Sequence, residues 1–134
     1  MNYWLVKSEP KKYSWGKFNE DGSTFWDGVR NYQARNNMKA MKKGDLVMFY
    51  HSNEGKEIVG YAKVIKEYYQ DPTTDDTRWV VVDLAPVDSL KHPVTLETIR
   101  KDDILSDIGL IKQQRLSVMP LKEEEFNRIL ELGL

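Results

Sequence analysis

Aromatic and amide side chains gather between Trp26 and Asn37, and these residue types are suited to holding a nucleobase. The segment contains two aromatic residues, two arginines, three asparagines and one glutamine. An indole gives a flat face on which a base can stack, a contact worth about 1–3 kcal/mol. Amides offer a donor and an acceptor to a base edge, and arginine pairs with phosphate or stacks on a base. The segment indicates either a base-binding pocket or, as the alternative, a buried Trp26 with asparagines that serve as caps and turns.

Three shorter clusters carry further polar side chains that a binding site can use. They are Lys7-Ser8-Glu9 at the end of a first strand, Phe49-Tyr50-His51-Ser52, and Gln113-Gln114-Arg115-Leu116-Ser117. Side chains alternate along a strand, so Tyr50 and Ser52 share one face if Phe49 faces the core. Each cluster alone is a weak signal.

Several common kinds of site have no support in the sequence. His51 and His92 lie far apart without the spacing of zinc ligands, and there is no Gly-rich phosphate loop of either common pattern. The chain has no cysteine, which removes disulfides, thiolate metal sites and cysteine nucleophiles and fits a reducing cytosol. We therefore expect no metal and no cofactor.

A basic segment lies within a chain whose net charge is only −1. That net charge does not by itself indicate a nucleic-acid binder. The segment between Gly28 and Lys43 contains no acid and five cations: Arg30, Arg35, Lys39, Lys42 and Lys43. It predicts either a local contact to a phosphate backbone or a solvated helix face.

Composition indicates an ordinary globular chain. Its 134 residues are enough for a buried core, and we expect one domain over residues 1–134. Apolar residues make up 40% and charged residues 31%, which is typical of a folded rather than a disordered chain. The apolar runs are too short to cross a bilayer, and the N-terminus lacks the pattern of a signal peptide. We expect a cytoplasmic monomer without a membrane partner.

The pattern of residues predicts more strands than helices. Strands are expected at residues 3–6, 45–52, 57–68, 78–87 and 116–119, with a hairpin turn at residues 53–56. Two helices are expected after caps, one from Ser14 to Gly22 and a short one that begins after Thr95. Two more are expected over residues 31–41, with Gly44 after the end, and over residues 122–132. The three long strands should form one antiparallel sheet that curves towards closure. The expected class is therefore α+β, a curved sheet or small barrel with helices on its rim, and an open two-layer sandwich is the competitor.

Four strings of residues together resemble the EVE domain family. They are residues 3–10 (YWLVKSEP), residues 26–36 (WDGVRNYQARN), residues 44–46 (GDL) with 49–52 (FYHS), and residues 115–118 (RLSV). The match is collinear over nearly the whole chain, and the second string is long and specific. Met119-Pro120 is a departure, because the family pattern has a glutamine before the proline.

The resemblance implies a PUA-like fold, a small and mostly antiparallel β-barrel flanked by helices and akin to the YTH domains that read methylated adenine. It also implies a pocket for a modified base, notably modified cytosine, so the expected partner is DNA or RNA that carries one. By analogy with YTH domains, Lys7, Ser8 and Trp26 fall at contacts to the base. Further candidates for the pocket or its rim are Asn31, Tyr32, Arg35, Tyr50, His51 and Ser52. Candidates for a rim that contacts the nucleic-acid backbone are Arg30, Lys39, Lys42, Lys43 and Arg115. Trp79 is either a second cage wall or a core residue.

The competing function is an enzyme. PUA-like relatives in the ASCH group include hydrolases of acylated cytidine, and Lys7 and Glu9 would face the same side of a strand as a possible acid–base pair. Pro10 is expected to turn the chain away from that arrangement. A third interpretation is a protein-interaction module that uses the acidic C-terminal helix, but no sequence motif supports it. We expect binding without catalysis.

Overall fold

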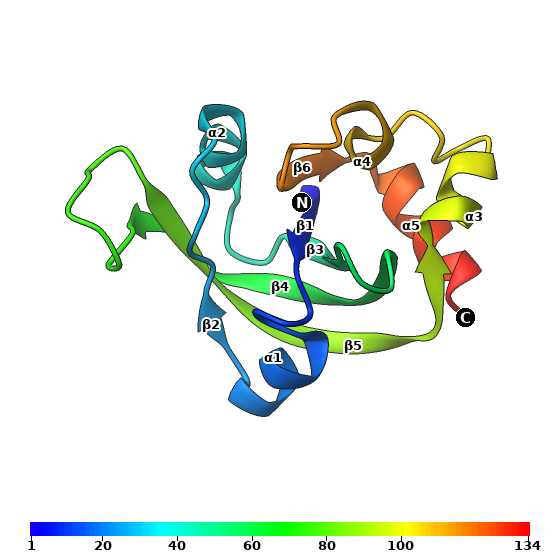
Figure 1. Ribbon diagram of the computed structural model, residues 1–134, viewed down its shortest axis with the longest axis horizontal. Helices are drawn as coiled ribbons and strands as arrows, with labels where there is room; N and C mark the ends of the chain where they lie inside the picture. Colours follow the sequence, from blue (N-terminus) through cyan, green and yellow to red (C-terminus); the bar gives the residue numbers. More distant parts are fainter.

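The computed structural model describes all 134 residues and is organised around one curved sheet (Figure 1). In spatial order its six strands are β2 (Thr24–Phe25), β5 (Val80–Thr95), β4 (Glu57–Gln70), β3 (Leu46–His51), β1 (Tyr3–Ser8) and β6 (Val118–Leu121). Neighbouring strands are antiparallel except β1 and β3, which run parallel. The order ends at β2 on one side and β6 on the other, so the sheet is open between these two edges.

The three long strands pair as expected, and their irregularities account for the curvature. β3, β4 and β5 are antiparallel neighbours, and the predicted hairpin turn at residues 53–56 joins the first two. Register shifts interrupt the β4–β5 ladder at several points, and such bulges bend and twist a strand pair. The β4–β5 hairpin crosses the whole molecule, and its connecting loop extends away from the helices α3, α4 and α5 (Figure 1).

β5 continues beyond Val87, where the predicted strand ends, and Pro93 does not stop it. Pro86 and Pro93 both lie inside the strand. β2 pairs with β5 only at Asp83 and Leu84, so the rest of β5 has β4 on one side and no strand on the other. Proline is tolerated on such a free side, since no ladder hydrogen bond is lost there. Pro120 lies inside the edge strand β6 for the same reason.

The capped helices form where their caps predict them. Ser14 accepts from the N–H of Lys17 at the start of α1 (Trp15–Asp21), Asn31 caps α2 (Tyr32–Ala40), and Thr95 caps α3 (Leu96–Lys101). α5 (Glu123–Leu132) closes the chain. No helix is long and apolar enough to span a membrane.

Three local predictions need correction. Gly44 does not follow the end of α2 directly, because that helix already ends at Ala40 with Met41 as its C-cap, and Gly44 adopts φ 95° in the turn into β3. The sequence did not predict β2, which has only two residues and is held by its pairing with β5. It also did not predict α4 (Gly109–Lys112), a four-residue helix without a side-chain cap.

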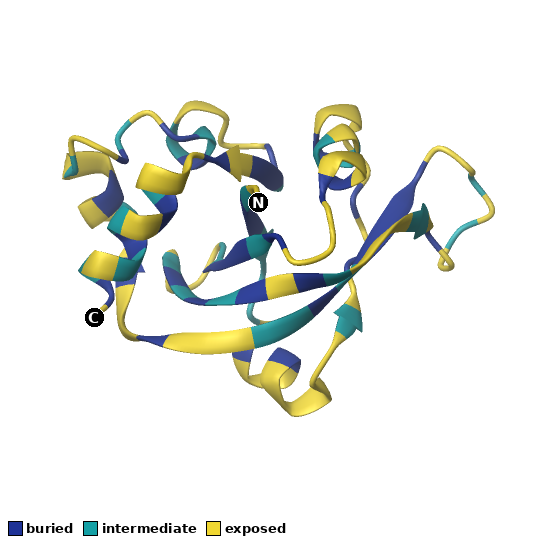
Figure 2. Cartoon of the chain, turned by 180° about the vertical axis from the view of Figure 1, so that it is seen from behind, coloured by how far each residue is buried: buried dark blue, intermediate teal, exposed yellow.

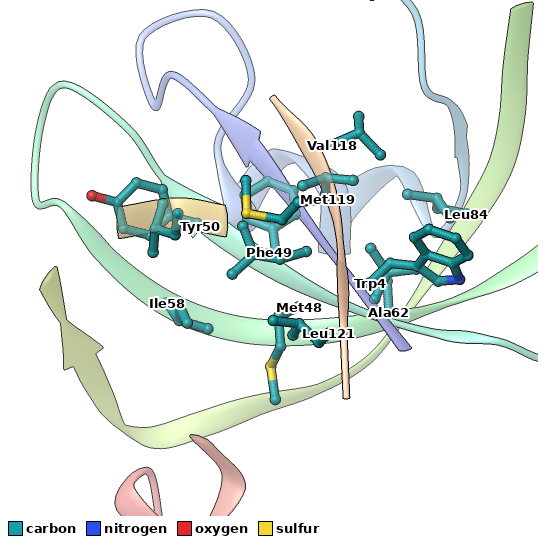
Figure 3. Close-up of a cluster of buried hydrophobic side chains, with 14 of the residues drawn as sticks. Trp4, Met48, Phe49, Tyr50, Ile58, Ala62, Leu84, Val118, Met119 and Leu121 are labelled. Carbon is teal, nitrogen blue, oxygen red and sulfur yellow. The ribbon is translucent and has the colours of Figure 1, made fainter. Parts of the chain in front are cut away.

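The core fills the concave side of the sheet and continues under the helices. In Figure 2 buried residues concentrate on the central strands and on one side of each helix. Figure 3 shows Phe49 of β3 and Met119 of β6 within one cluster that also includes Trp4 of β1. At its border the buried carboxylate of Asp45 accepts from the indole N–H of Trp4 and from the backbone N–H of Lys42, at 3.0 and 2.9 Å. These contacts join the starts of β1 and β3, at the opposite end of the two strands from Ser8 and His51.

Candidate functional site

A cavity of about 610 Å³ lies where the two edges of the sheet approach each other. Five segments line it: Lys7–Glu9 at the end of β1, Lys12–Tyr13 before α1, Thr24–Gly28 from β2 onward, Ser52–Asn53 after β3, and the residues Gln114, Arg115 and Ser117 before β6. We call it the seam cavity. Its volume falls in the range of about 300–1,000 Å³ that is typical of small-molecule sites.

Trp26 forms an aromatic wall of the seam cavity and belongs to the core as well. Its side chain is only 7% exposed, and its ring lies edge-on to Phe49, with ring centroids 5.5 Å apart. Phe18 and Tyr13 contact the same ring. Its backbone N–H donates to Val82 of β5 at 2.8 Å, which continues the pairing of β2. Trp26 is therefore a core residue that also lines the cavity, and its stacking on a base stays a prediction.

Lys7 and Ser8 tie the walls of the cavity together. The ammonium of Lys7 donates to the carbonyl of Gln114 at 2.7 Å, and its backbone N–H donates to Ser117 at 3.0 Å. Ser8 donates through its hydroxyl to Tyr13 and accepts at its carbonyl from the N–H of Ser52. Partial burial lowers the pKa of Lys7. Both residues thus hold three chain segments at fixed distances around the cavity.

Other polar side chains of the seam cavity are free of internal partners. Asp27, Asn53 and Arg115 make no side-chain hydrogen bond or ion pair within the chain, and all three are exposed. Gly28 turns the chain directly after Asp27 with φ 79°, a left-handed conformation that favours glycine. The cavity therefore presents a carboxylate acceptor and several donors next to an aromatic wall.

A second cavity of about 270 Å³ adjoins the first and shares four of its residues: Lys7, Ser52, Asn53 and Gln114. We call it the cation cavity, because its lining also includes Lys56 and Arg100. Tyr50 lines this second cavity rather than the first. Its ring lies at the end of the core cluster, and its hydroxyl points away from the labelled core side chains in Figure 3. Burial raises the pKa of Tyr50, and the nearby Arg100 acts against that rise.

His51 lines neither cavity and supports α1 instead. Its Nε2 accepts from the backbone N–H of Trp15 at 3.0 Å, which satisfies a free donor of the first turn. Because accepting requires an unprotonated nitrogen, the ring is neutral in this arrangement. Partial burial lowers the pKa of His51, and Glu57 opposes that effect.

Tyr32 and Arg35, further along the aromatic and amide segment, lie in a separate surface cluster. Tyr32 stacks on the buried Trp79, with centroids 5.3 Å apart, and Arg35 lies over Tyr32 at 4.9 Å. Arg78 donates to the Tyr32 hydroxyl at 3.0 Å, and the side chain of Asn31 caps α2. None of these residues lines the seam cavity, so the structure divides the segment at Gly28. Their contact with nucleic acid stays a prediction.

The basic segment also lies outside both cavities. Its members Arg30, Arg35, Lys39, Lys42 and Lys43 are here called the α2 basic face. Arg30 pairs with the fully buried carboxylate of Asp71 at 2.9 Å. Lys39 lies 5.3 Å from the ring centroid of Tyr68, and Lys42 lies 3.9 Å from Glu67. The structure does not bring this face to the pocket, and its contact with phosphate stays a prediction.

The predicted residues that do meet in the seam cavity are Lys7, Ser8, Trp26, Ser52 and Arg115. Sequence reasoning did not single out Asp27, Asn53 or Phe25, although all three line it. Asp27 and Asn53 lie in or beside turns that contain Gly28 and Gly55. Glycine together with Asp or Asn is typical of turns, so the sequence could have predicted that these two polar side chains are exposed. Whether a polar side chain lacks a partner is a property of the assembled fold.

A curved, mostly antiparallel sheet with flanking helices and a cavity at its open edge defines a PUA-like protein, as the sequence predicted. The chain belongs to the EVE domain family, whose sequence profile matches residues 2–132. Mouse thymocyte nuclear protein 1 is 39% identical, over 98% of this chain and 73% of the relative. A crystal structure of an Agrobacterium tumefaciens protein is 44% identical, with a TM-score of 0.97, over 99% of this chain and 93% of that chain.

A structure with a ligand is also similar. The human THYN1 protein in complex with DNA containing 5-methylcytosine is 34% identical, with a TM-score of 0.91, over 99% of this chain and 98% of that chain. The ASCH protein from Zymomonas mobilis, at 11% identity and a TM-score of 0.63, shares the fold alone.

Proposed function

We propose that this protein binds a modified cytosine, presented by a DNA or RNA strand, in the seam cavity. The observation that carries the proposal is the combination of the aromatic wall Trp26 with polar side chains that have no partner inside the protein. The human THYN1 complex with DNA containing 5-methylcytosine supports the choice of ligand.

The free polar groups match the edge of cytosine. Cytosine offers an amino donor at N4, and carboxylates accept from that group. The Asp27 carboxylate provides such an acceptor, while Asn53 and Arg115 provide donors for the carbonyl and ring nitrogen of the same edge. Thymine or uracil would place a carbonyl oxygen against Asp27 and leave it unpaired, which is unfavourable. We therefore assign base identity to Asp27 and stacking to Trp26.

The energetics allow a modest preference for the modification. A base in a duplex must be flipped out at a cost of a few kcal/mol, and a single strand avoids part of that cost. Stacking on Trp26 would offset this cost by about 1–3 kcal/mol of binding free energy. A methyl group that fits against the wall adds about 0.8 kcal/mol, which corresponds to about fourfold in affinity. Selectivity for the modification should therefore be several-fold, smaller than selectivity for the base.

The hydrolase alternative receives less support from the geometry. Lys7 and Glu9 both line the seam cavity, but they make no ion pair with each other. Lys7 donates to a backbone carbonyl, and Glu9 pairs with Lys12 at 3.4 Å. The general acid–base pair that hydrolysis would need is not assembled. Incubation with modified nucleosides, followed by chromatography, tests this alternative directly, since any new product would favour it.

The deciding experiment uses Asp27→Asn with Asp75→Asn as its control. Asp75 is an exposed acid in the β4–β5 loop and lines neither cavity, so both variants lose one negative charge. Oligonucleotides with 5-methylcytosine, cytosine or thymine at one position are titrated as DNA and as RNA. Asp27→Asn should reduce the preference for cytosine over thymine by roughly tenfold, since a charged hydrogen bond is lost. Asp75→Asn should match the unaltered protein.

Trp26→Ala is a less informative variant, because the ring also belongs to the core and its loss should lower stability by about 3–5 kcal/mol. The proposal fails if the unaltered protein binds 5-methylcytosine, cytosine and thymine equally well. It also fails if Asp27→Asn keeps the original preference.

A further inference from the structure

The cation cavity has a lining in which every charge is positive. Lys7 comes from the end of β1, Lys56 from the turn before β4, and Arg100 from α3. Tyr50, Ser52, Asn53 and Gln114 add hydroxyl and amide groups, and no carboxylate lines the cavity. Such a lining favours an anion, because its three charges are positive and its hydroxyl and amide groups can donate hydrogen bonds.

These three cations are not neutralised by the protein itself. The ion pairs of the chain involve other lysines and arginines, including Lys42 with Glu67 and Lys101 with Glu97. Lys7 uses its ammonium on a carbonyl, while Lys56 and Arg100 make no side-chain hydrogen bond at all. Three positive charges around one small cavity repel one another, and a bound anion would remove that repulsion.

The backbone determines where two of the cations, Lys56 and Arg100, lie. Lys56 adopts φ 49°, a conformation that a lysine rarely takes without a structural reason. Its carbonyl accepts from the N–H of Leu96 at 2.9 Å, which joins the β3–β4 turn to the first residue of α3. Arg100 lies one helical turn further along α3, and both side chains reach the same cavity. The strained turn thus positions Lys56 beside Arg100.

The two cavities share one wall. Lys7, Ser52, Asn53 and Gln114 line both, so a ligand that fills the seam cavity can continue into the cation cavity past these side chains. In a nucleotide the base and its own phosphate are joined by a single sugar. A base site and a phosphate site of one nucleotide must therefore be neighbours.

We propose that the cation cavity binds the phosphate group next to the base held in the seam cavity, with Lys56 and Arg100 as its main contacts. This inference rests on the proposed function, since it takes the base in the seam cavity as given. Arginine and lysine are the residues that bind phosphate through charged hydrogen bonds. Phosphate contacts of this kind position a strand without reading its sequence.

The test compares Lys56→Gln/Arg100→Gln with Lys42→Gln/Lys43→Gln. Both double variants remove two positive charges, but the second pair lies on the α2 basic face. Each protein is titrated at several salt concentrations with single strands that carry 5-methylcytosine or cytosine. The cation-cavity variant should bind both strands roughly tenfold more weakly at low salt. Its slope of log K against log salt should become shallower by about 0.7, because one phosphate is no longer neutralised, and its preference for 5-methylcytosine should persist.

Two further ligands locate the phosphate. A strand with one uncharged methylphosphonate linkage beside the 5-methylcytosine should bind the unaltered protein more weakly and should cause no further loss of affinity in Lys56→Gln/Arg100→Gln. The monophosphate of the modified nucleoside, compared with the nucleoside, shows whether a terminal phosphate is enough. A gain in affinity from that phosphate in the unaltered protein, and none in the variant, supports the same site.

The outcomes separate the two proposals. An unchanged salt slope in Lys56→Gln/Arg100→Gln would overturn the phosphate site, and so would an equal loss of affinity in Lys42→Gln/Lys43→Gln, because the effect would then be one of net charge. Failure of the unaltered protein to distinguish 5-methylcytosine, cytosine and thymine would overturn the base site, whatever the salt slopes are.

Discussion

The α2 basic face and the cation cavity carry similar charge but differ in how that charge is used. On the α2 basic face Arg30 is held by Asp71, Lys42 lies near Glu67, and Lys39 covers an aromatic ring. In the cation cavity Lys56 and Arg100 have no such partner. Four of the five cations of the α2 basic face thus have a partner inside the protein, and the Lys43 side chain has none. The cations available to a ligand come from separate segments.

Topology explains why these separate segments meet. β1 lies between β3 and β6, so the end of β1, the turn after β3 and the segment before β6 come together at one end of the sheet. α3 is joined to the same turn through Lys56 and Leu96. The comparison therefore predicts that damage to the seam cavity at this end of the sheet affects ligand selectivity, whereas damage around the α2 basic face lowers stability and leaves selectivity unchanged.

The largest effect is expected for Gly60→Ala. A Cβ at Gly60 would overlap with the ring of Trp15, which packs against Phe49 at 5.1 Å, and Phe49 in turn contacts Trp26. Overpacking of this kind should cost about 3 kcal/mol of unfolding free energy and should shift the wall of the seam cavity. Denaturant unfolding and titration with modified and unmodified strands measure the two effects.

Gly16→Ala is the matched control, since a Cβ there meets nothing closer than 3.8 Å and the residue lies in α1. This variant should be neutral or more stable by up to about 1 kcal/mol. A Gly60→Ala protein that unfolds like the original would show that Trp15 does not support the cavity wall.

A smaller loss of stability is expected for Asp71→Ala, which tests the α2 basic face. The buried carboxylate accepts from Arg30 at 2.9 Å and from the N–H and hydroxyl of Thr73 at 2.8 and 2.6 Å. Its removal should lower the unfolding free energy by about 1–3 kcal/mol while base selectivity stays unchanged. Asp75→Asn, in the same loop, should leave both properties as they are. A change of base selectivity in Asp71→Ala would mean that this face takes part in recognition.

The smallest effect concerns His51 and pH. Burial holds the pKa of His51 below its ordinary value of 6.5, so its contribution to stability is present above about pH 6.5 and is lost as pH falls through the folded-state pKa. The ring is partly exposed, so the decrease should be roughly 0.5 kcal/mol or less. Urea unfolding at about pH 7.5 and about pH 5.5 should show a weaker pH dependence in His51→Gln than in the original. His92→Gln, at an exposed position, should retain the original dependence.

The sequence was enough to predict helices and strands whose ends are determined by residues close to them in the chain. The caps Ser14 and Thr95 marked two helices, and the β3–β4 turn marked a hairpin. β2 escaped prediction because two residues carry no periodicity and the element exists only through its pairing with β5. The part of β5 beyond Val87 escaped prediction because Pro93 indicates the end of a strand unless its outer side is known to be free.

The same distinction applies to the candidate site, where some residues could be predicted from the sequence and others could not. The resemblance to EVE domains pointed to Lys7, Ser8 and Trp26, which the structure brings into one cavity. It did not point to Lys56 or Arg100, because their availability depends on which acids lie near them in three dimensions. Charge composition gives the number of cations in a segment, and only the fold determines which of them remain unpaired.

The open seam also bears on how the protein behaves at high concentration. Unpaired sheet edges are templates on which another chain can add a strand, and they favour aggregation. Here one edge, β2, has two residues, and the other, β6, has four and includes Pro120, which has no N–H to donate. Neither of these edges offers a continuous row of backbone groups to a foreign strand. The free outer side of β5 includes Pro86 and Pro93, which have no N–H to donate either. The sheet can therefore remain open to a small planar ligand while self-association through its edges is disfavoured.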